Sequence, residues 1–157
     1  MVDPLTNNLP HSPAGPLPGD PTEPGIELPV SLWEQMRDDA EARLPQEACG
    51  LVGGVQRRAM QVYPVANSLH SPVQYRMEPE EQVRIFLDLE KLGWDLLAIY
   101  HSHPAGPDHP SPTDLAEAAY PEAVYLIWFP SAGEWACRGY LITTDQYAEV
   151  PVRVIDR

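Results

Sequence analysis

Basic residues are scarce in this sequence, and that scarcity limits the partners it can have. Lysine and arginine together number 10 against 23 aspartates and glutamates, which gives a formal net charge of −13 over 157 residues. A nucleic-acid-binding surface normally needs a basic face that displaces the counterions of the phosphates. The charge balance therefore argues against DNA or RNA as the main partner, and we interpret the acidity as serving solubility.

Cysteines and long apolar runs are also few. The two cysteines, Cys49 and Cys137, cannot build a disulfide framework and form no C-x-x-C pair. We expect both thiols to be reduced, as in the cytosol. A disulfide between them is the alternative if their strands are adjacent. No apolar run reaches the roughly 18 residues of a membrane helix, and no basic region followed by an apolar stretch begins the chain. These absences predict a cytoplasmic protein without a membrane partner.

Proline is concentrated at the N-terminus, where residues 1–24 contain Pro4, Pro10, Pro13, Pro16, Pro18, Pro21 and Pro24. Few large apolar residues accompany them, so the segment cannot bury enough surface to offset its ordering entropy. We expect a disordered or polyproline-like tail over residues 1–24. The length of the remainder suits one domain over residues 25–157.

Three segments of that domain have helical patterns. The first follows Pro29 and ends at Pro45, with an apolar face that recurs every four residues at Leu32, Met36, Ala40 and Leu44. The second is expected from Pro79 to about Leu92, with Gly93 after its end and an apolar face of Val83, Phe86, Leu87 and Leu92 that Ile85 and Leu89 broaden. The third is short, begins around Ser111–Pro112 and carries Leu115, Ala116, Ala118 and Ala119.

Strand-like runs separate these helices. They lie at residues 48–55, 60–65, 95–100, 124–129, 135–142 and 148–155. Leu96 to Ile99 form a continuous apolar run that is typical of a buried strand. The order of the elements predicts a mixed β-sheet flanked by helices, an α/β or α+β domain.

A histidine pair follows that buried strand. His101 and His103 are two residues apart, and alternate side chains of an extended strand share one face, so the two imidazoles can converge. Asp114, just inside the next helix, can complete a triangle of ligands. Two histidines and one aspartate suit Zn²⁺ and leave a fourth position for water, which is the mark of a catalytic zinc site.

Structural roles compete with this interpretation at each position. Histidines at strand ends are commonly polar edge residues, and an aspartate early in a helix interacts with the helix dipole. Ser111 with Asp114 three residues later also resembles a capping box, a role that is compatible with a catalytic one. A zinc deaminase would need H-x-E and P-C-x-x-C, and the sequence has neither.

The spacing resembles a known motif. Three features are similar to the signature of the JAMM (MPN+, JAB) zinc metallopeptidase family: His101-Ser-His103-Pro, the ten residues between His103 and Asp114, and Pro110-Ser111-x-x-Asp114. Glu47 precedes Ala-Cys-Gly-Leu-Val-Gly-Gly, which resembles the E-x-C-G start of bacterial and archaeal members. Asn67 and the stretch from Tyr75 to Pro79 add to the resemblance, which spans roughly residues 26–142.

The resemblance implies roles for five residues. His101, His103 and Asp114 would bind zinc, Glu47 would act as general base, and Ser111 would stabilise the oxyanion. It also implies the JAB/MPN fold, which is related to a cytidine deaminase-like architecture. His70 and His109 are expected at the surface, and Cys49 is expected to pack beside Glu47 without acting as a nucleophile.

The resemblance is strongest to the small bacterial branch linked to ubiquitin-like sulfur carriers. It implies a peptidase or isopeptidase that hydrolyses the amide bond after the C-terminal Gly-Gly of such a carrier. The leaving group, which could be cysteine, a peptide or a lysine side chain, stays open. A catalytically inactive scaffold of the same fold is the alternative, but scaffolds typically lose the ligands that are intact here. The DNA-repair-named branch with a similar H-x-H loop is disfavoured by the net charge and by the E-A-C-G start.

Overall fold

The computed structural model describes residues 23–156 of the chain, so most of the expected tail lies outside the described residues. The elements are β1 (Ile26–Pro29), α2 (Val30–Arg43), β2 (Cys49–Val55), β3 (Arg58–Val65), α3 (Pro79–Leu92), β4 (Asp95–Ser102), α4 (Pro112–Glu117), β5 (Val124–Ser131), β6 (Glu134–Thr143), β7 (Gln146–Val150) and β8 (Val152–Ile155). No helix among the described residues is both long and apolar enough to cross a bilayer.

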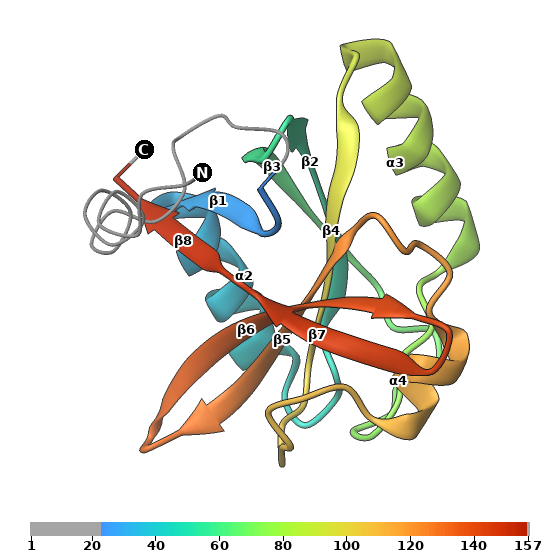
Figure 1. Cartoon of the computed structure of the whole chain (residues 1–157). Helices are drawn as coiled ribbons and strands as arrows, with labels where there is room; N and C mark the ends of the chain where they lie inside the picture. The colour runs from blue at the N-terminus through green and yellow to red at the C-terminus, as the bar shows by residue number, and fades with distance from the viewer. Residues whose placement is uncertain (1–22, 157) are drawn as a thin grey trace, which may run out of the picture.

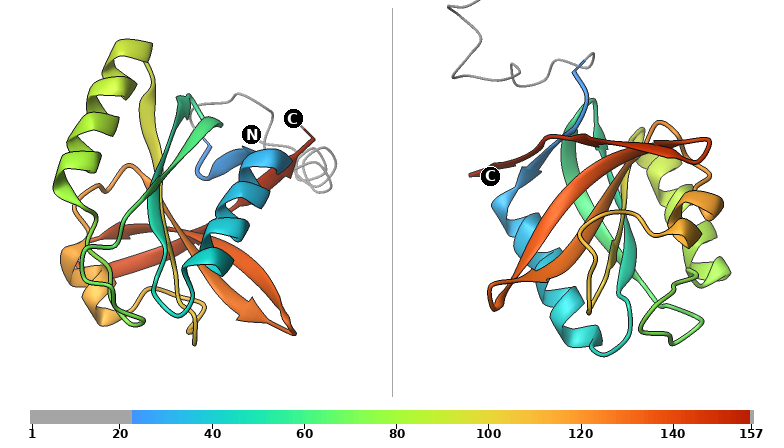
Figure 2. Two further views of the ribbon diagram at one scale, coloured as in Figure 1. Left: turned by 180° about the vertical axis from the view of Figure 1, so that it is seen from behind. Right: turned by 60° about the horizontal axis from the view of Figure 1, so that its bottom comes forward.

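The strands form one mixed sheet, as the order of elements predicts. Its strand order is β7-β6-β5-β4-β2-β3-β1-β8, with β4 and β5 parallel and β4 and β2 antiparallel. Helix α2 packs on one face, and α3 and α4 pack on the other (Figures 1 and 2). The strands at the centre of the sheet, β4 and β2, therefore have both faces covered.

Two features of the sheet differ from the sequence expectation. The segment before α2 forms β1, a short strand that pairs with β3 and β8 and that the sequence pattern did not predict. The last expected strand, residues 148–155, is divided at Pro151 into β7 and β8, which lie at opposite edges of the sheet. Because proline has no backbone N–H, it cannot continue the strand ladder and marks the change of partner.

The apolar face of α2 is largely as expected. Met36 and Ala40 are fully buried, and Leu32 packs partly buried against the same core. Leu44 was expected on this face but is 43% exposed. The helix ends at Arg43, because the residue before a proline is disfavoured in helical conformation, and Leu44 therefore turns away from the sheet.

The bounds of α3 agree with the sequence, but three of the four residues expected to form its apolar face are exposed, and only Phe86 packs against the core. Val83, Leu87 and Leu92 are 58%, 53% and 50% exposed, whereas Ile85 and Leu89 are 8% and 3% exposed. A helix on a sheet buries one stripe, and here that stripe contains Ile85 and Leu89. Gly53 on β2 permits this approach, because a β-carbon there would lie 2.3 Å from Leu89.

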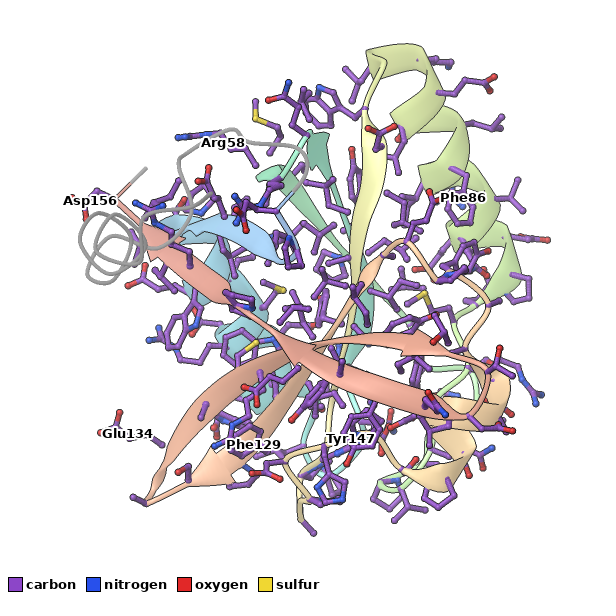
Figure 3. The ribbon with its side chains drawn as sticks, in the orientation of Figure 1. Arg58, Phe86, Phe129, Glu134, Tyr147 and Asp156 are labelled. Carbon is purple, nitrogen blue, oxygen red and sulfur yellow. The ribbon has the colours of Figure 1, made fainter. Side chains whose placement is uncertain are left out.

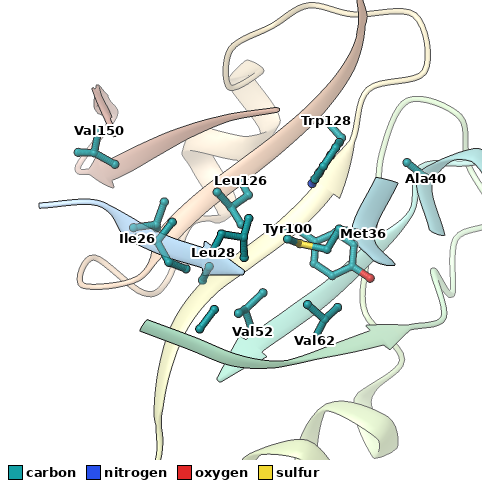
Figure 4. Packing of buried hydrophobic residues seen from close by; sticks show 13 residues of the cluster. Ile26, Leu28, Met36, Ala40, Val52, Val62, Tyr100, Leu126, Trp128 and Val150 are labelled. Atoms are coloured by element: carbon teal, nitrogen blue, oxygen red, sulfur yellow. The ribbon is translucent and has the colours of Figure 1, made fainter. Parts of the chain in front are cut away.

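The core on the α2 side is closed and apolar. Ile26, Leu28, Met36, Leu126 and Trp128 meet there with almost no exposed surface (Figure 4). Full burial of such side chains is worth roughly 1.5–3 kcal/mol each, so this face carries much of the stability.

Candidate metal centre

Alternation along β4 directs its side chains to two different faces. Ala98 and Tyr100 belong to the core beneath α2, whereas Ile99 belongs to the core beneath α3. His101 follows the parity of Ile99, lies opposite Cys49 of β2 and is 1% exposed. His103 keeps the same parity just past the strand, where its N–H donates to the Trp128 carbonyl at 2.7 Å.

The two histidines meet Asp114 in a triangle, as their spacing predicts. His101 Nε2 lies 3.0 Å from His103 Nε2, and each nitrogen lies 3.1 Å from Asp114 Oδ2. Ligand bonds of about 2.0–2.1 Å around tetrahedral zinc would separate neighbouring ligand atoms by about 3.3 Å. Two imidazoles and a carboxylate at this separation therefore fit one Zn²⁺.

Asp114 is held in place by the start of α4. The Ser111 hydroxyl accepts from the Asp114 N–H at 3.0 Å, and Ser111 N–H donates to Asp114 Oδ2 at 2.9 Å, which completes the predicted capping box. Burial opposes ionisation of this carboxyl, but hydrogen bonds from His101 and His103 outweigh it and hold its pKa well below the usual range. Asp114 is therefore an anion aimed at both imidazoles.

The ring nitrogens that face away from this triangle differ between the two histidines. His103 Nδ1 is 2.8 Å from the Pro107 carbonyl, which can only accept, so Nδ1 carries the proton and Nε2 keeps its lone pair when neutral. His101 Nδ1 is buried and has no hydrogen-bond partner. Burial lowers the pKa of His101, whereas for His103 the bonds to Asp114 and Pro107 prevail over burial and raise it.

Glu47 lies next to the triangle through the pairing of β2 with β4. Ala48 N–H donates to the Ser102 hydroxyl at 2.7 Å, and Ser102 N–H donates to the Ala48 carbonyl at 3.0 Å. Continuing this register sets Glu47 opposite His103. The Glu47 side chain is 4% exposed, and its Oε1 has no hydrogen-bond partner. Burial raises its pKa to about 8, with His103 lowering it and Asp114 raising it.

The loop between β3 and α3 supports the site in a way that the sequence did not predict. The buried Asn67 side chain donates to the carbonyls of Glu47, Ser71 and Gln74 at 3.1, 3.4 and 3.0 Å. Its Oδ1 accepts from the N–H groups of Leu69 and Arg76. Tyr75 stacks on His101 with ring centroids 4.6 Å apart. The only advance signal of Asn67 and Tyr75 was their place in the family resemblance.

The other side chains singled out in the sequence are less directly placed. His109 and His70 are exposed as expected, and His109 stacks on Tyr147 with centroids 6.2 Å apart. Cys49 and Cys137 are free thiols on β2 and β6, which are not adjacent strands. Burial raises the pKa of Cys49 to about 12, so it is an inert packing residue.

A cavity of about 160 Å³ opens beside the triangle. Asp114 lines it together with Tyr75 and Met77 from the loop before α3 and Tyr120 from the segment after α4. Asp114 is therefore the member of the triangle that reaches the wall of this hollow.

Several characterised proteins are similar to this chain. A desampylase from Haloferax volcanii is 36% identical over 131 residues, which cover 79% of this chain and 89% of the relative. A CysO-cysteine peptidase from Mycobacterium tuberculosis is 33% identical, covering 72% and 80%. A probable TtuB-protein conjugate cleaving protease from Thermus thermophilus is 37% identical, covering 76% and 77%.

The fold has solved counterparts as well. A protein from Desulfitobacterium hafniense superposes with a TM-score of 0.76 at 36% identity, covering 84% of this chain and 94% of that one. A JAB1/MPN domain protein from Archaeoglobus fulgidus has a TM-score of 0.54 at 17% identity, covering 83% and 99%, which bears on the fold alone. The family model of prokaryotic homologs of the JAB domain matches residues 29–139. Since that match includes β2, β4 and the complete triangle, the chain belongs to the family of prokaryotic JAB-domain proteins.

Proposed function

We propose that this chain is a zinc-dependent peptidase that hydrolyses the amide bond after the C-terminal Gly-Gly of a ubiquitin-like sulfur-carrier protein or of its conjugates. The observation that carries the proposal is the triangle of His101, His103 and Asp114 with edges of 3.0–3.1 Å beside the buried Glu47. The relatives named for cleaving CysO-cysteine and TtuB-protein conjugates support the choice of substrate.

The metal would be held by the two Nε2 atoms and by Asp114 Oδ2. Zinc bound there would lower the pKa of a water ligand from about 15.7 towards 7 and polarise the scissile carbonyl. The positive charge would also relieve the burial that raises the Glu47 pKa, because a nearby cation favours a carboxylate. Glu47 would therefore be ionised in the loaded enzyme and able to accept a proton.

Glu47 then moves the proton that hydrolysis requires. The attacking water would form a bond from its oxygen to the carbonyl carbon of the second glycine, and Glu47 would accept the proton that the water loses. When the carbon–nitrogen bond breaks, Glu47 returns that proton to the leaving amine. A buried carboxylate without a fixed hydrogen bond on Oε1 is suited to this alternation, because no partner has to be displaced.

Ser111 has a free donor for the negative oxygen that develops on the scissile carbonyl. Its Oγ accepts from the Asp114 N–H, which leaves the hydroxyl proton for another acceptor. The same residue thus orients Asp114 and is available as an oxyanion donor.

A glycine pair suits the substrate position, because residues without side chains can bring their carbonyl close to a recessed site.

The proposal is tested with a purified sulfur carrier extended by Gly-Gly and one further residue or peptide. Mass spectrometry after incubation with zinc-loaded enzyme should show cleavage after the second glycine. Replacing that glycine by a bulky residue in the substrate should block cleavage. Efficient cleavage of the bulky variant would indicate a general peptidase. Zinc binding without cleavage of any carrier fusion would favour the catalytically inactive scaffold.

The ligand assignment has its own test. Purified protein should hold about one zinc per chain, which chelators remove together with the activity. His103→Ala and Asp114→Ala should be depleted of zinc in elemental analysis, whereas His109→Ala should hold the wild-type amount, because His109 is exposed and outside the triangle. Full zinc occupancy in the first two variants would reject the assignment.

A further inference from the structure

Two histidines of the triangle need to be oriented, but only one has a hydrogen bond for that purpose. A metal-binding imidazole is normally fixed by a hydrogen bond from its other ring nitrogen. His103 has this bond, from Nδ1 to the Pro107 carbonyl at 2.8 Å. His101 has none, because its Nδ1 is buried without a partner. The ring of His101 must therefore be held by packing.

Tyr75 supplies that packing. Its ring lies on the face of His101 with centroids 4.6 Å apart and planes 25° apart, which is a stacked geometry. The edge of the His103 ring faces His101, with ring centroids 4.7 Å apart and ring planes at 68°. The contact of Tyr75 with His101 is this ring stacking, so the contribution of Tyr75 to His101 comes from its ring.

The backbone on both sides of Tyr75 is anchored to the body of the site. The carboxamide of Asn67 accepts from Arg76 N–H at 3.2 Å and donates to the Gln74 carbonyl at 3.0 Å. The same carboxamide donates to the Glu47 carbonyl at 3.1 Å. Asn67 is 2% exposed, so these bonds are shielded from water. The backbone on both sides of Tyr75 is thus held by the same residue that donates to the backbone of Glu47.

We propose that Tyr75 is a positioning residue of the metal centre, whose ring holds the His101 imidazole with Nε2 towards the metal in place of a hydrogen bond to Nδ1. The inference rests on the proposed zinc site and adds a residue to it. It predicts that the ring of Tyr75 affects metal affinity, that the hydroxyl does not, and that the effect is present without any substrate.

The test measures zinc affinity of the full chain by competition with a chromophoric chelator. Tyr75→Leu should raise the dissociation constant for zinc about 10–100-fold, the usual effect of removing a residue that orients a metal ligand. Tyr75→Phe should bind zinc as the wild type does, because it keeps the ring. In cobalt-loaded protein, the visible absorption bands should shift in Tyr75→Leu and stay unchanged in Tyr75→Phe.

Tyr147→Leu is the matched control. Tyr147, which is labelled in Figure 3, also stacks on a histidine, His109, but that residue is outside the triangle, and both side chains are exposed. Its zinc affinity should equal that of the wild type. Melting of each chelator-treated variant separates loss of metal binding from loss of fold. If Tyr75→Leu does not fold, Tyr75→Met fills the space with a flexible side chain that has no ring face.

The outcomes separate this inference from the proposed function. Wild-type affinity in a folded Tyr75→Leu or Tyr75→Met variant overturns the role of Tyr75 and leaves the peptidase proposal intact. Equal weakening in Tyr75→Phe and Tyr75→Leu overturns it too, because the hydroxyl would then be responsible. A wild-type protein that binds no zinc overturns both proposals.

Discussion

The two faces of the central strands are built by the same alternation but serve different ends. On the face beneath α2, β4 contributes Ala98 and Tyr100 to an apolar core, and the Tyr100 hydroxyl donates to Asp39 at 2.7 Å. On the opposite face, the corresponding alternation gives Ile99 and then His101 and His103. Apolar residues are buried on both faces, but on the second the strand ends also carry buried polar groups, which stabilise the fold only when they are paired.

The comparison predicts that substitutions of the buried polar groups at the strand ends alter chemistry, whereas substitutions in the apolar core beneath α2 alter stability. Glu47→Gln gives the largest expected effect on turnover. The amide has nearly the same shape but cannot accept the proton, so carrier cleavage should fall about 10²–10⁴-fold with zinc still bound. Rates from single-turnover assays and elemental analysis check both parts.

Glu27→Gln is the control for loss of a buried acid. Glu27 is 2% exposed on β1 and lies 3.9 Å from Arg153, away from the triangle. Its substitution should change stability but leave the cleavage rate of the folded enzyme unaltered. A wild-type cleavage rate in Glu47→Gln would remove Glu47 from the mechanism.

Trp128→Ala is the complementary substitution on the α2 face. The side chain is fully buried and packs on Trp33 with ring centroids 5.1 Å apart. Truncation leaves a cavity, so the free energy of unfolding should fall by about 3–5 kcal/mol. Denaturant titration of the metal-free protein measures this loss. Zinc affinity of the folded variant should be close to that of the wild type, and a large loss would mean that the two faces are not independent.

The metal-free protein should also show a pH dependence that originates on the site face. Burial raises the pKa of Glu47 from 4.5 to about 8, so the folded state binds a proton more tightly than the unfolded state does. The stability from this proton is present below the unfolded pKa and is lost as pH rises towards 8. Between pH 5 and pH 8 the loss should be about 3–4 kcal/mol.

Glu47→Gln isolates this contribution. The glutamine does not titrate, so residue 47 should no longer lower the free energy of unfolding as pH rises. The wild type should therefore lose stability relative to the variant, and the variant should be the more stable protein at high pH. Unfolding titrations with a chelator at several pH values provide the comparison. The same slope in both proteins would show that another group, such as His103 with its raised pKa, dominates.

The site could be predicted from the sequence to the extent that it depends on local geometry. The spacing of His101 and His103 gives one strand face, and the capping box of Ser111 fixes Asp114 within four residues. Tyr75 and Asn67 could not be given roles in this way. Their contacts with His101 and Glu47 join segments 20 or more residues apart, and no local pattern specifies which loop closes over a strand end.

The fold shows the same division between local and non-local information. The bounds of α3 follow from Pro79, its acidic first turn and Gly93, whose φ of 71° is the left-handed conformation that glycine tolerates. The strand β1 escaped prediction because four residues are too few for a periodic signal, and its pairing with β8 joins the two ends of the domain. Ile85 and Leu89, the buried residues of α3, were expected only to broaden its apolar face, because apolar residues surround much of the helix.

The two sides of α3 extend the comparison of faces to a single helix, and its exposed side gives the smallest predicted change in the free energy of unfolding. Leu87 is 53% exposed and Leu89 is 3% exposed, two residues apart on the same element. Leu87→Ala should change the free energy of unfolding by no more than about 0.5 kcal/mol, because little apolar surface leaves contact. Leu89→Ala should cost about 2–5 kcal/mol, because it empties the contact with Gly53. Both substitutions have the same helix propensity change, so denaturant titration of the pair measures burial alone. Equal losses in the two variants would mean that the outer face of α3 is covered by something in solution.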